Sequence, residues 1–183
     1  QGHLDRLNHS LVSLQINWPM EKRSFMVVVR EVVRRNHVKF GLVYIQITRG
    51  VARRDHPFPT NTQSAIVVTA RKMPPLDKNV LNKGVNVITI PDIRWERKDI
   101  KSISLLPNCL GKQQAREAGA FEAWQYDGEG NITEGTSSNA WIVTKDGELV
   151  TKQIGSTILN GITRLAVLES AREAGFSISE RAF

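Results

Sequence analysis

A single lysine, Lys101, stands between Ile100 and a run that ends at Leu106, just after the strongly charged stretch RWERKD. When burial lowers the pKa of a lysine, its amine becomes a nucleophile that can form a Schiff base with a carbonyl group. A surface lysine fits the same pattern, because its methylene stem packs on apolar neighbours while the charge stays in water. The residues around Lys101 therefore indicate either covalent catalysis or an ordinary surface position.

Two further segments carry groups that suit an anion. In ILNGITR, residues 158–164, a glycine turn leads into a predicted helix whose first turn contains Thr163. The free N–H groups at a helix start favour phosphate, and the threonine hydroxyl adds another donor. An ordinary turn before a helix has the same pattern. Arg6 follows His3 by one helical turn in HLDRL and faces either solvent or an anion.

Glu134 and the pair formed by Arg54 and His56 suggest contacts with a charged ligand. Glu134 is the one carboxylate of TEGTSSN, a loop-like segment at 133–139, where it either pairs with a cationic ring nitrogen or is solvated at a strand end. Arg54 and His56 are two residues apart in TRGVARRDHPFP, and such residues point to one side of an extended chain. Together they would bind a substrate carboxylate, with a surface loop as the alternative.

The charge balance narrows the classes of partner. The chain has 25 Lys and Arg residues against 18 Asp and Glu residues, for a net charge of +7. These basic residues are scattered and interleaved with acids, without the aromatic–basic alternation of proteins that stack single-stranded bases. A small anionic ligand, or solubility alone, explains the charge better than a nucleic-acid partner. No apolar run reaches the length of a membrane span, so we expect no membrane partner.

The chain lacks the spacing of a metal site. Its four histidines, at positions 3, 9, 37 and 56, do not follow a ligand pattern, and one cysteine cannot build a thiolate cluster. A Gly-x-Ser-x-Gly elbow and a Walker-type loop are also absent from the sequence. The single cysteine, Cys109, cannot form an internal disulfide, which favours a reducing, cytoplasmic location.

Hydrophobic periodicity predicts a mixed α/β (α+β) chain in two parts. Helical spacing at 3–16 and 19–33 is followed by two strand-like stretches at 41–48 and 64–70. The segment KMPPLD contains two prolines and predicts a linker. We therefore expect an N-terminal α/β part at 1–71, a linker at 72–78 and a larger, β-rich part at 79–183.

The second part should alternate strands with two helices. Strands are predicted at 85–90 and 121–126, with a hairpin around Asp146-Gly147 formed by 140–144 and 148–151. The helices are predicted at 104–118 and 162–174, and the glycines that follow them, Gly119 and Gly175, suit helix C-caps.

Five segments, taken in order, resemble the fold-type-IV PLP-dependent aminotransferases, and among them the D-amino-acid aminotransferases. They are HLDRL, YIQITRGVARRDHPFP, DIRWERKDIKSISLLPNCLGKQQA, EGTSSN and ILNGITR. The resemblance runs along nearly the whole chain and implies the fold of that family. It also implies that members continue beyond both ends of this chain, so we expect an internal fragment.

The resemblance assigns a role to individual residues. Lys101 matches the lysine that binds pyridoxal 5′-phosphate (PLP) as a Schiff base and then moves the proton between Cα and C4′. Glu134 matches the glutamate that pairs with the pyridinium nitrogen. The remaining cofactor contacts match Arg6, Ile162 and Thr163 at the phosphate, Leu159 against the ring face, and Arg94 near the ring. The substrate carboxylate contacts match Tyr44, Arg54 and His56, with Arg54 and His56 supplied in this family by the neighbouring subunit of a homodimer.

The activity implied by the resemblance is exchange of an amino group between a D-amino acid and a 2-oxo acid. The Arg54-x-His56 pair is the feature that favours D-amino acids. Two enzymes of the same fold remain as alternatives, a branched-chain-amino-acid aminotransferase and an aminodeoxychorismate lyase. A non-catalytic basic module that binds anions is the alternative outside the enzymes.

Overall fold

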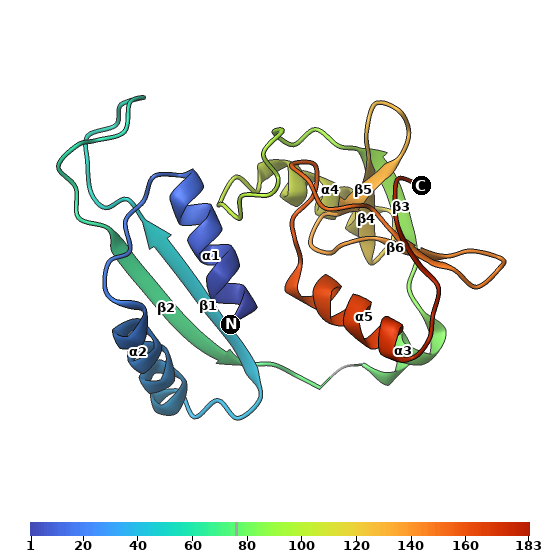
Figure 1. Cartoon of the computed structure of the whole chain (residues 1–183), viewed down its shortest axis with the longest axis horizontal. Helices are drawn as coiled ribbons and strands as arrows, with labels where there is room; N and C mark the ends of the chain where they lie inside the picture. The colour runs from blue at the N-terminus through green and yellow to red at the C-terminus, as the bar shows by residue number, and fades with distance from the viewer. Residues whose placement is uncertain (76) are drawn as a thin grey trace. The chain divides into compact units, whose positions relative to one another are not determined.

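The computed structural model describes residues 1–75 and 77–183. The chain forms two compact units (Figure 1). The first unit is Leu11–Leu81, and the second combines Gln1–Ser10 with Asn82–Phe183. The sequence assigned the first ten residues to the N-terminal part, whereas the structure groups them with the C-terminal residues. A helix carries them there, and its last residues belong to the first unit.

The first unit is built on a two-stranded hairpin. Its strands pair in antiparallel register from Gly41↔Lys72 to Thr48↔Ala65. A helix packs against the second strand, and its fully buried Phe25 meets Trp18 edge to face at 5.7 Å. The elements are α1 (Gly2–Ser13), shared with the second unit, α2 (Lys22–Arg35), β1 (Gly41–Thr48), β2 (Ala65–Lys72) and α3 (Lys78–Lys83), which ends in the second unit.

The predicted linker at 72–78 is only partly covered by the described residues. Strand β2 continues to Lys72 and helix α3, which the sequence did not predict, begins at Lys78. Leu76 lies outside the described residues. The linker therefore stays a prediction.

The second unit contains two three-stranded sheets, each of which holds one parallel and one antiparallel pair. Parallel neighbours need a crossover connection, and here helices α4 and α5 each lie between the two strands of a parallel pair. The first sheet has the order β3 (Val87–Pro91), β4 (Glu122–Tyr126), β5 (Ile132–Gly135), and the second has the order β6 (Trp141–Val143), β7 (Leu149–Thr151), β8 (Ile178–Glu180). The helices are α4 (Leu106–Glu117) and α5 (Ile162–Glu173).

Helix α4 packs against the first sheet over a small apolar core. Ile90, Ala115 and Ala123 form this core. The helix comes so close that a Cβ at Gly111 would collide with Ile90 Cδ1 and lie 2.9 Å from Thr136 Cγ2. Glycine at position 111 therefore permits the close approach of α4 to the turn after β5.

Most predicted elements lie within a few residues of their observed bounds. Gly119 and Gly175 follow their helices with positive φ angles of 68° and 77°, which confirms them as C-cap glycines. The main correction concerns 133–139, predicted as a loop, because its first three residues belong to β5. Within the described residues, no helix combines the length and hydropathy that a membrane span requires.

Candidate active site

A cavity of about 590 Å³ opens in the second unit. Its walls come from α1, the segment after β3, the end of β5 with the following turn, and the start of α5. All seven residues predicted to bind a cofactor line it: Arg6, Arg94, Lys101, Glu134, Leu159, Ile162 and Thr163. Residues from four distant parts of the sequence thus meet in one place.

Glu134 is a buried carboxylate at the end of β5, with 4% of its surface exposed. It accepts hydrogen bonds from Arg94 Nη1, from the backbone N–H of Leu159 at 3.2 Å and from Asn139 Nδ2 at 3.1 Å. Burial raises the pKa of the Glu134 carboxyl, and the charge of Arg94 opposes that shift. The contacts fix the carboxylate at the cavity wall, so the interpretation of Glu134 as a solvated strand end is wrong.

Arg94 joins Glu134 to a second buried carboxylate, Asp92. Its Nε and Nη2 atoms donate to the two oxygens of Asp92 at 2.9 and 2.7 Å, and the side chain of Asp92 is 1% exposed. Thr133 Oγ1 donates to Asp92 at 2.8 Å, and Lys98 Nζ lies 3.2 Å away. Burial alone would raise the pKa of Asp92, but hydrogen bonds from Arg94 and Thr133 lower it to about 2. Two carboxylates and two cations therefore balance in one network.

Lys101 is attached to α1 through its backbone. Its N–H donates to the hydroxyl of Ser10 at 3.0 Å, and that hydroxyl donates to the carbonyl of Arg6 at 3.1 Å. The residue is exposed, and it lines the cavity. The surrounding protein and the charge of Arg6 lower the pKa of the Lys101 amine, and Glu134 raises it. The amine is thus easier to deprotonate than that of an ordinary surface lysine.

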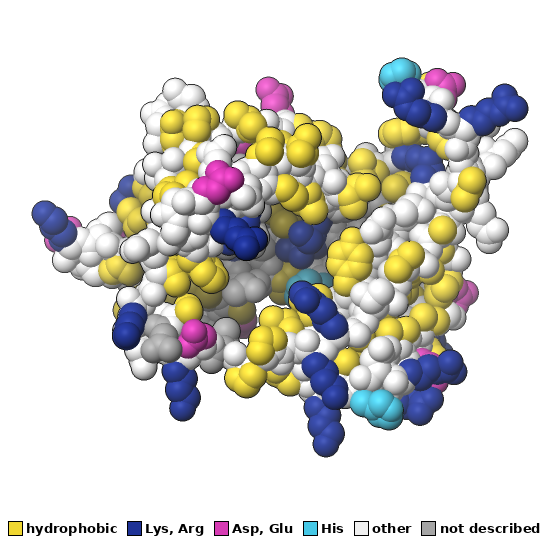
Figure 2. Space-filling view, turned by 180° about the vertical axis from the view of Figure 1, so that it is seen from behind, with side chains coloured by type: hydrophobic (Ala, Val, Ile, Leu, Met, Phe, Trp, Pro, Cys, Tyr) yellow, Lys and Arg dark blue, Asp and Glu magenta, His cyan; other side chains and the backbone are white. Residues whose placement is uncertain are grey.

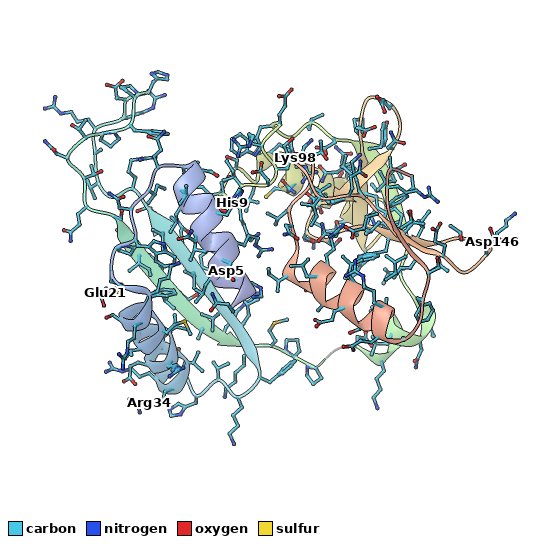
Figure 3. The ribbon with its side chains drawn as sticks, viewed as in Figure 1. Asp5, His9, Glu21, Arg34, Lys98 and Asp146 are labelled. Atoms are coloured by element: carbon cyan, nitrogen blue, oxygen red, sulfur yellow. The ribbon has the colours of Figure 1, made fainter. Side chains whose placement is uncertain are left out.

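A second contact ties α1 to the segment before Lys101. His9 Nε2 lies 3.0 Å from Asp99 Oδ2, and Arg97 holds both oxygens of Asp99 at 2.9 Å. Figure 3 shows His9 on α1 beside the segment that carries Lys98. Helix α1 therefore positions Lys101 from two sides, through Ser10 and through His9.

The start of α5 forms the part of the cavity wall that suits an anion. Gly161 is the N-cap and supplies no side-chain cap, so the first-turn N–H groups of α5 are free of that contact. A Cβ at Gly161 would collide with Asn139 Oδ1, so glycine permits the close packing here. Arg6 Nη1 donates to the carbonyl of Asn160 at 2.9 Å, just before this helix start. Thr163 lies in the first turn, as predicted.

The three residues predicted to bind the substrate carboxylate belong to the first unit. Tyr44 is 46% exposed on β1, and its hydroxyl donates to Gln46 Oε1 at 2.8 Å. Arg54 and His56 are exposed in the connection between β1 and β2. Basic side chains and a histidine gather at the end of this connection in Figure 2. These residues are not among those that line the cavity.

Several residues of the site were not predicted from the sequence. Asp92 stands two positions before Arg94, and Ser10 follows Arg6 at the i+4 spacing that places both on one face of a helix. These two spacings were usable signals. The other unpredicted residues are His3, Lys98, Glu122 and Asn139, whose contacts depend on segments far away in the chain.

The comparison with protein families agrees with this arrangement. The whole of residues 1–183 matches the family of class IV amino-transferases. The chain belongs to this family. The fold class predicted from the five segments is thereby confirmed.

Relatives of known name cover the chain almost completely. It is 40% identical over 183 residues to the D-alanine aminotransferase of Staphylococcus aureus (strain MSSA476), a match that covers 99% of this chain and 64% of that protein. The D-alanine aminotransferase of Listeria innocua is 36% identical, with 99% of this chain and 63% of that protein covered. The chain thus spans just under two thirds of the length of the curated relatives that it matches.

Solved structures confirm the fold. The branched-chain amino acid aminotransferase of Escherichia coli superposes with a TM-score of 0.85 at 25% identity, covering 100% of this chain and 62% of that chain. A second branched-chain amino acid aminotransferase, from the source abbreviated T.th. and solved with pyridoxamine 5′-phosphate, gives 0.82 at 27% identity, covering 99% and 61%. A putative 4-amino-4-deoxychorismate lyase of Legionella pneumophila gives 0.82 at 21% identity, covering 99% and 66%, and shows the fold alone.

Proposed function

We propose that this chain is the cofactor-binding portion of a PLP-dependent aminotransferase. The observation that supports it most is the cavity itself, which brings together a lysine amine, a buried carboxylate and an uncapped helix start. A volume of about 590 Å³ lies within the range of roughly 300–1,000 Å³ typical of small-molecule sites.

The donor set of the cavity suits each part of PLP. The phosphate would be held by Arg6, by Thr163 and by the first-turn N–H groups of α5. Glu134 would pair with the ring nitrogen, and the amine of Lys101 would bind the carbonyl carbon. Leu159 and Ile162 supply apolar contacts at the ring. Arg94, which the structure places on Glu134, would act on the ring through that carboxylate.

The residues of the chain would divide the reaction between them. PLP, when bound, supplies an electron-withdrawing ring that stabilises negative charge at the substrate Cα. Lys101 Nζ would remove the proton at Cα and return it at C4′. Its lowered pKa favours the free amine that this step requires. Glu134, fixed by Arg94 and Asn139, would hold a proton on the ring nitrogen.

We further propose a D-amino acid and a 2-oxo acid as substrates. The D-alanine aminotransferases at 36–40% identity support this choice. Tyr44, Arg54 and His56 would bind the substrate carboxylate, with Arg54 and His56 supplied by the second subunit of a homodimer. A cytoplasmic location belongs to the same proposal. The second candidate is branched-chain-amino-acid transamination, which the similarity to the Escherichia coli enzyme favours.

The chain mixed with PLP and then with D-alanine provides the test. We expect a visible absorption band that disappears on addition of D-alanine while pyruvate forms. Lys101→Ala should lose both the band and the turnover, whereas Lys145→Ala, a matched change of an exposed lysine in the β6–β7 connection, should keep both. Turnover of L-leucine without D-alanine would establish the second candidate. Persistence of band and turnover in Lys101→Ala would refute the proposed function.

A further inference from the structure

One buried carboxylate of the second unit has no part in the function proposed above. Glu122 on β4 is 4% exposed and lies against the turn that follows β5. It accepts hydrogen bonds from the hydroxyls of Thr136, of Ser137 at 2.7 Å and of Ser138 at 3.3 Å. The N–H of Ser137 adds a bond at 3.3 Å. Three successive side chains of the cavity wall thus point a hydrogen at one carboxylate.

The charge of Glu122 makes this arrangement one-directional. Burial alone would raise its pKa, but the hydrogen bonds from Thr136 and Ser137 lower it, and Lys112 Nζ lies 3.5 Å from Oε1. An ionised carboxylate only accepts, and a hydroxyl has a single hydrogen to donate. The hydroxyls of the turn therefore keep only oxygen lone pairs for a ligand.

The other donors of the turn are also occupied. The N–H of Gly135 donates to the carbonyl of Ser138 at 2.7 Å, and the N–H of Thr136 donates to the carbonyl of Ala123 at 3.0 Å. Asn139 Nδ2 donates to Glu134 and to the carbonyl of Leu159. This side of the cavity consequently offers acceptors, in contrast to Arg6, Lys101 and the start of α5, which offer donors.

We propose that Glu122 is a positioning residue that makes the Thr136–Ser138 turn a hydrogen-bond acceptor, so that this wall binds the amine of the ligand and gives no support to an anionic group. The inference rests on the function proposed above and adds a specificity to it. Anionic groups are left to Arg6 and α5. The wall distinguishes the amino form of a ligand from a form that lacks the amine.

The test compares two ligands that differ only at that position. Pyridoxamine 5′-phosphate carries an aminomethyl group where 4-deoxypyridoxine 5′-phosphate carries a methyl group, and neither forms a covalent bond with Lys101. Titration calorimetry of the cofactor-free chain gives the ratio of the two Kd values. In Glu122→Gln the amide donates where the carboxylate accepted, which turns a hydroxyl hydrogen toward the cavity. One lost hydrogen bond predicts a roughly 3- to 10-fold smaller preference for the amine.

Two further variants make the result decisive. Ser137→Ala removes one acceptor without burying an amide and should reduce the preference in the same direction, even if Glu122→Gln fails to fold. Glu169→Gln, the same change at an exposed position of α5, should leave the ratio unchanged. Equal weakening of both ligands would mean a structural role only and would overturn the inference. If the unaltered chain binds neither ligand, the proposed function fails and the inference falls with it.

Discussion

The cavity of the second unit and the β1–β2 connection of the first unit contain the same kinds of charged residue in opposite physical settings. Arg94 is 7% exposed and all three of its guanidinium nitrogens donate to carboxylates. Arg54 is exposed in a connection whose base is anchored by Arg49, which donates to the carbonyls of Leu14 and Gln15 and lies 3.7 Å above the Phe58 ring. Buried groups must be paired by the fold itself, whereas exposed groups remain available to a ligand.

The largest effect should follow from breaking the buried network. Arg94→Ala leaves Asp92 and Glu134 close together without the cation between them, and loss of one partner of a buried pair costs about 3–5 kcal/mol. We expect this loss in the free energy of unfolding, measured by urea titration with tryptophan fluorescence. A value within about 1 kcal/mol of the unaltered chain would show that the network contributes little to stability.

The exposed connection should show the opposite behaviour. If Arg54 binds the substrate carboxylate through charge-assisted hydrogen bonds, Arg54→Ala should raise KM for the amino acid by about 10- to 100-fold. The free energy of unfolding should change by no more than about 0.5 kcal/mol, because the residue is exposed. Arg53→Ala serves as the matched control in the same connection. An equal rise of KM in both variants would remove the specific role of Arg54.

The sequence predicted the two regions with different success. Long periodic segments were placed well, because the spacing of apolar residues depends only on local order, and β1 has the predicted bounds. The cofactor residues were recovered through the resemblance of whole segments, and the cavity contains all seven. Strand β5 was missed because TEGTSSN has the composition of a turn.

Buried partners were beyond the reach of local patterns. Thr133 reaches Asp92 across 41 positions, and Asn139 reaches the carbonyl of Leu159 across 20. Nothing in either segment identifies the other, since the contact exists only after the sheet has formed. The same applies to Glu122, which meets the Thr136–Ser138 turn through the pairing of β4 with β5. Tertiary structure therefore supplies the contacts that fix the orientation of the site.

Acid should weaken the second unit through Asp92. Its pKa in the folded chain is about 2, below the ordinary value of 3.8, so the ionised form is stabilised by folding. That contribution is complete above the ordinary pKa and disappears as the pH falls through the folded value. At about 1.4 kcal/mol per pKa unit it amounts to about 2 kcal/mol. Unfolding free energies measured from about pH 5 down to about pH 2 should fall more steeply for the unaltered chain than for Asp92→Asn. Parallel curves would contradict the assignment.

The smallest effect should come from Glu31, although the pKa of this carboxyl is also about 2. Hydrogen bonds from Arg34 and Arg35 lower it, but the three residues lie on the solvent face of α2, where Figure 3 shows Arg34. Water and salt screen such pairs, so the same pKa has much less consequence for folding. Glu31→Gln should shift Tm far less than Asp92→Asn, and the shift should vanish in concentrated salt. A salt-resistant loss as large as that of Asp92→Asn would show that hydrogen bonding, rather than burial, sets the difference between the two regions.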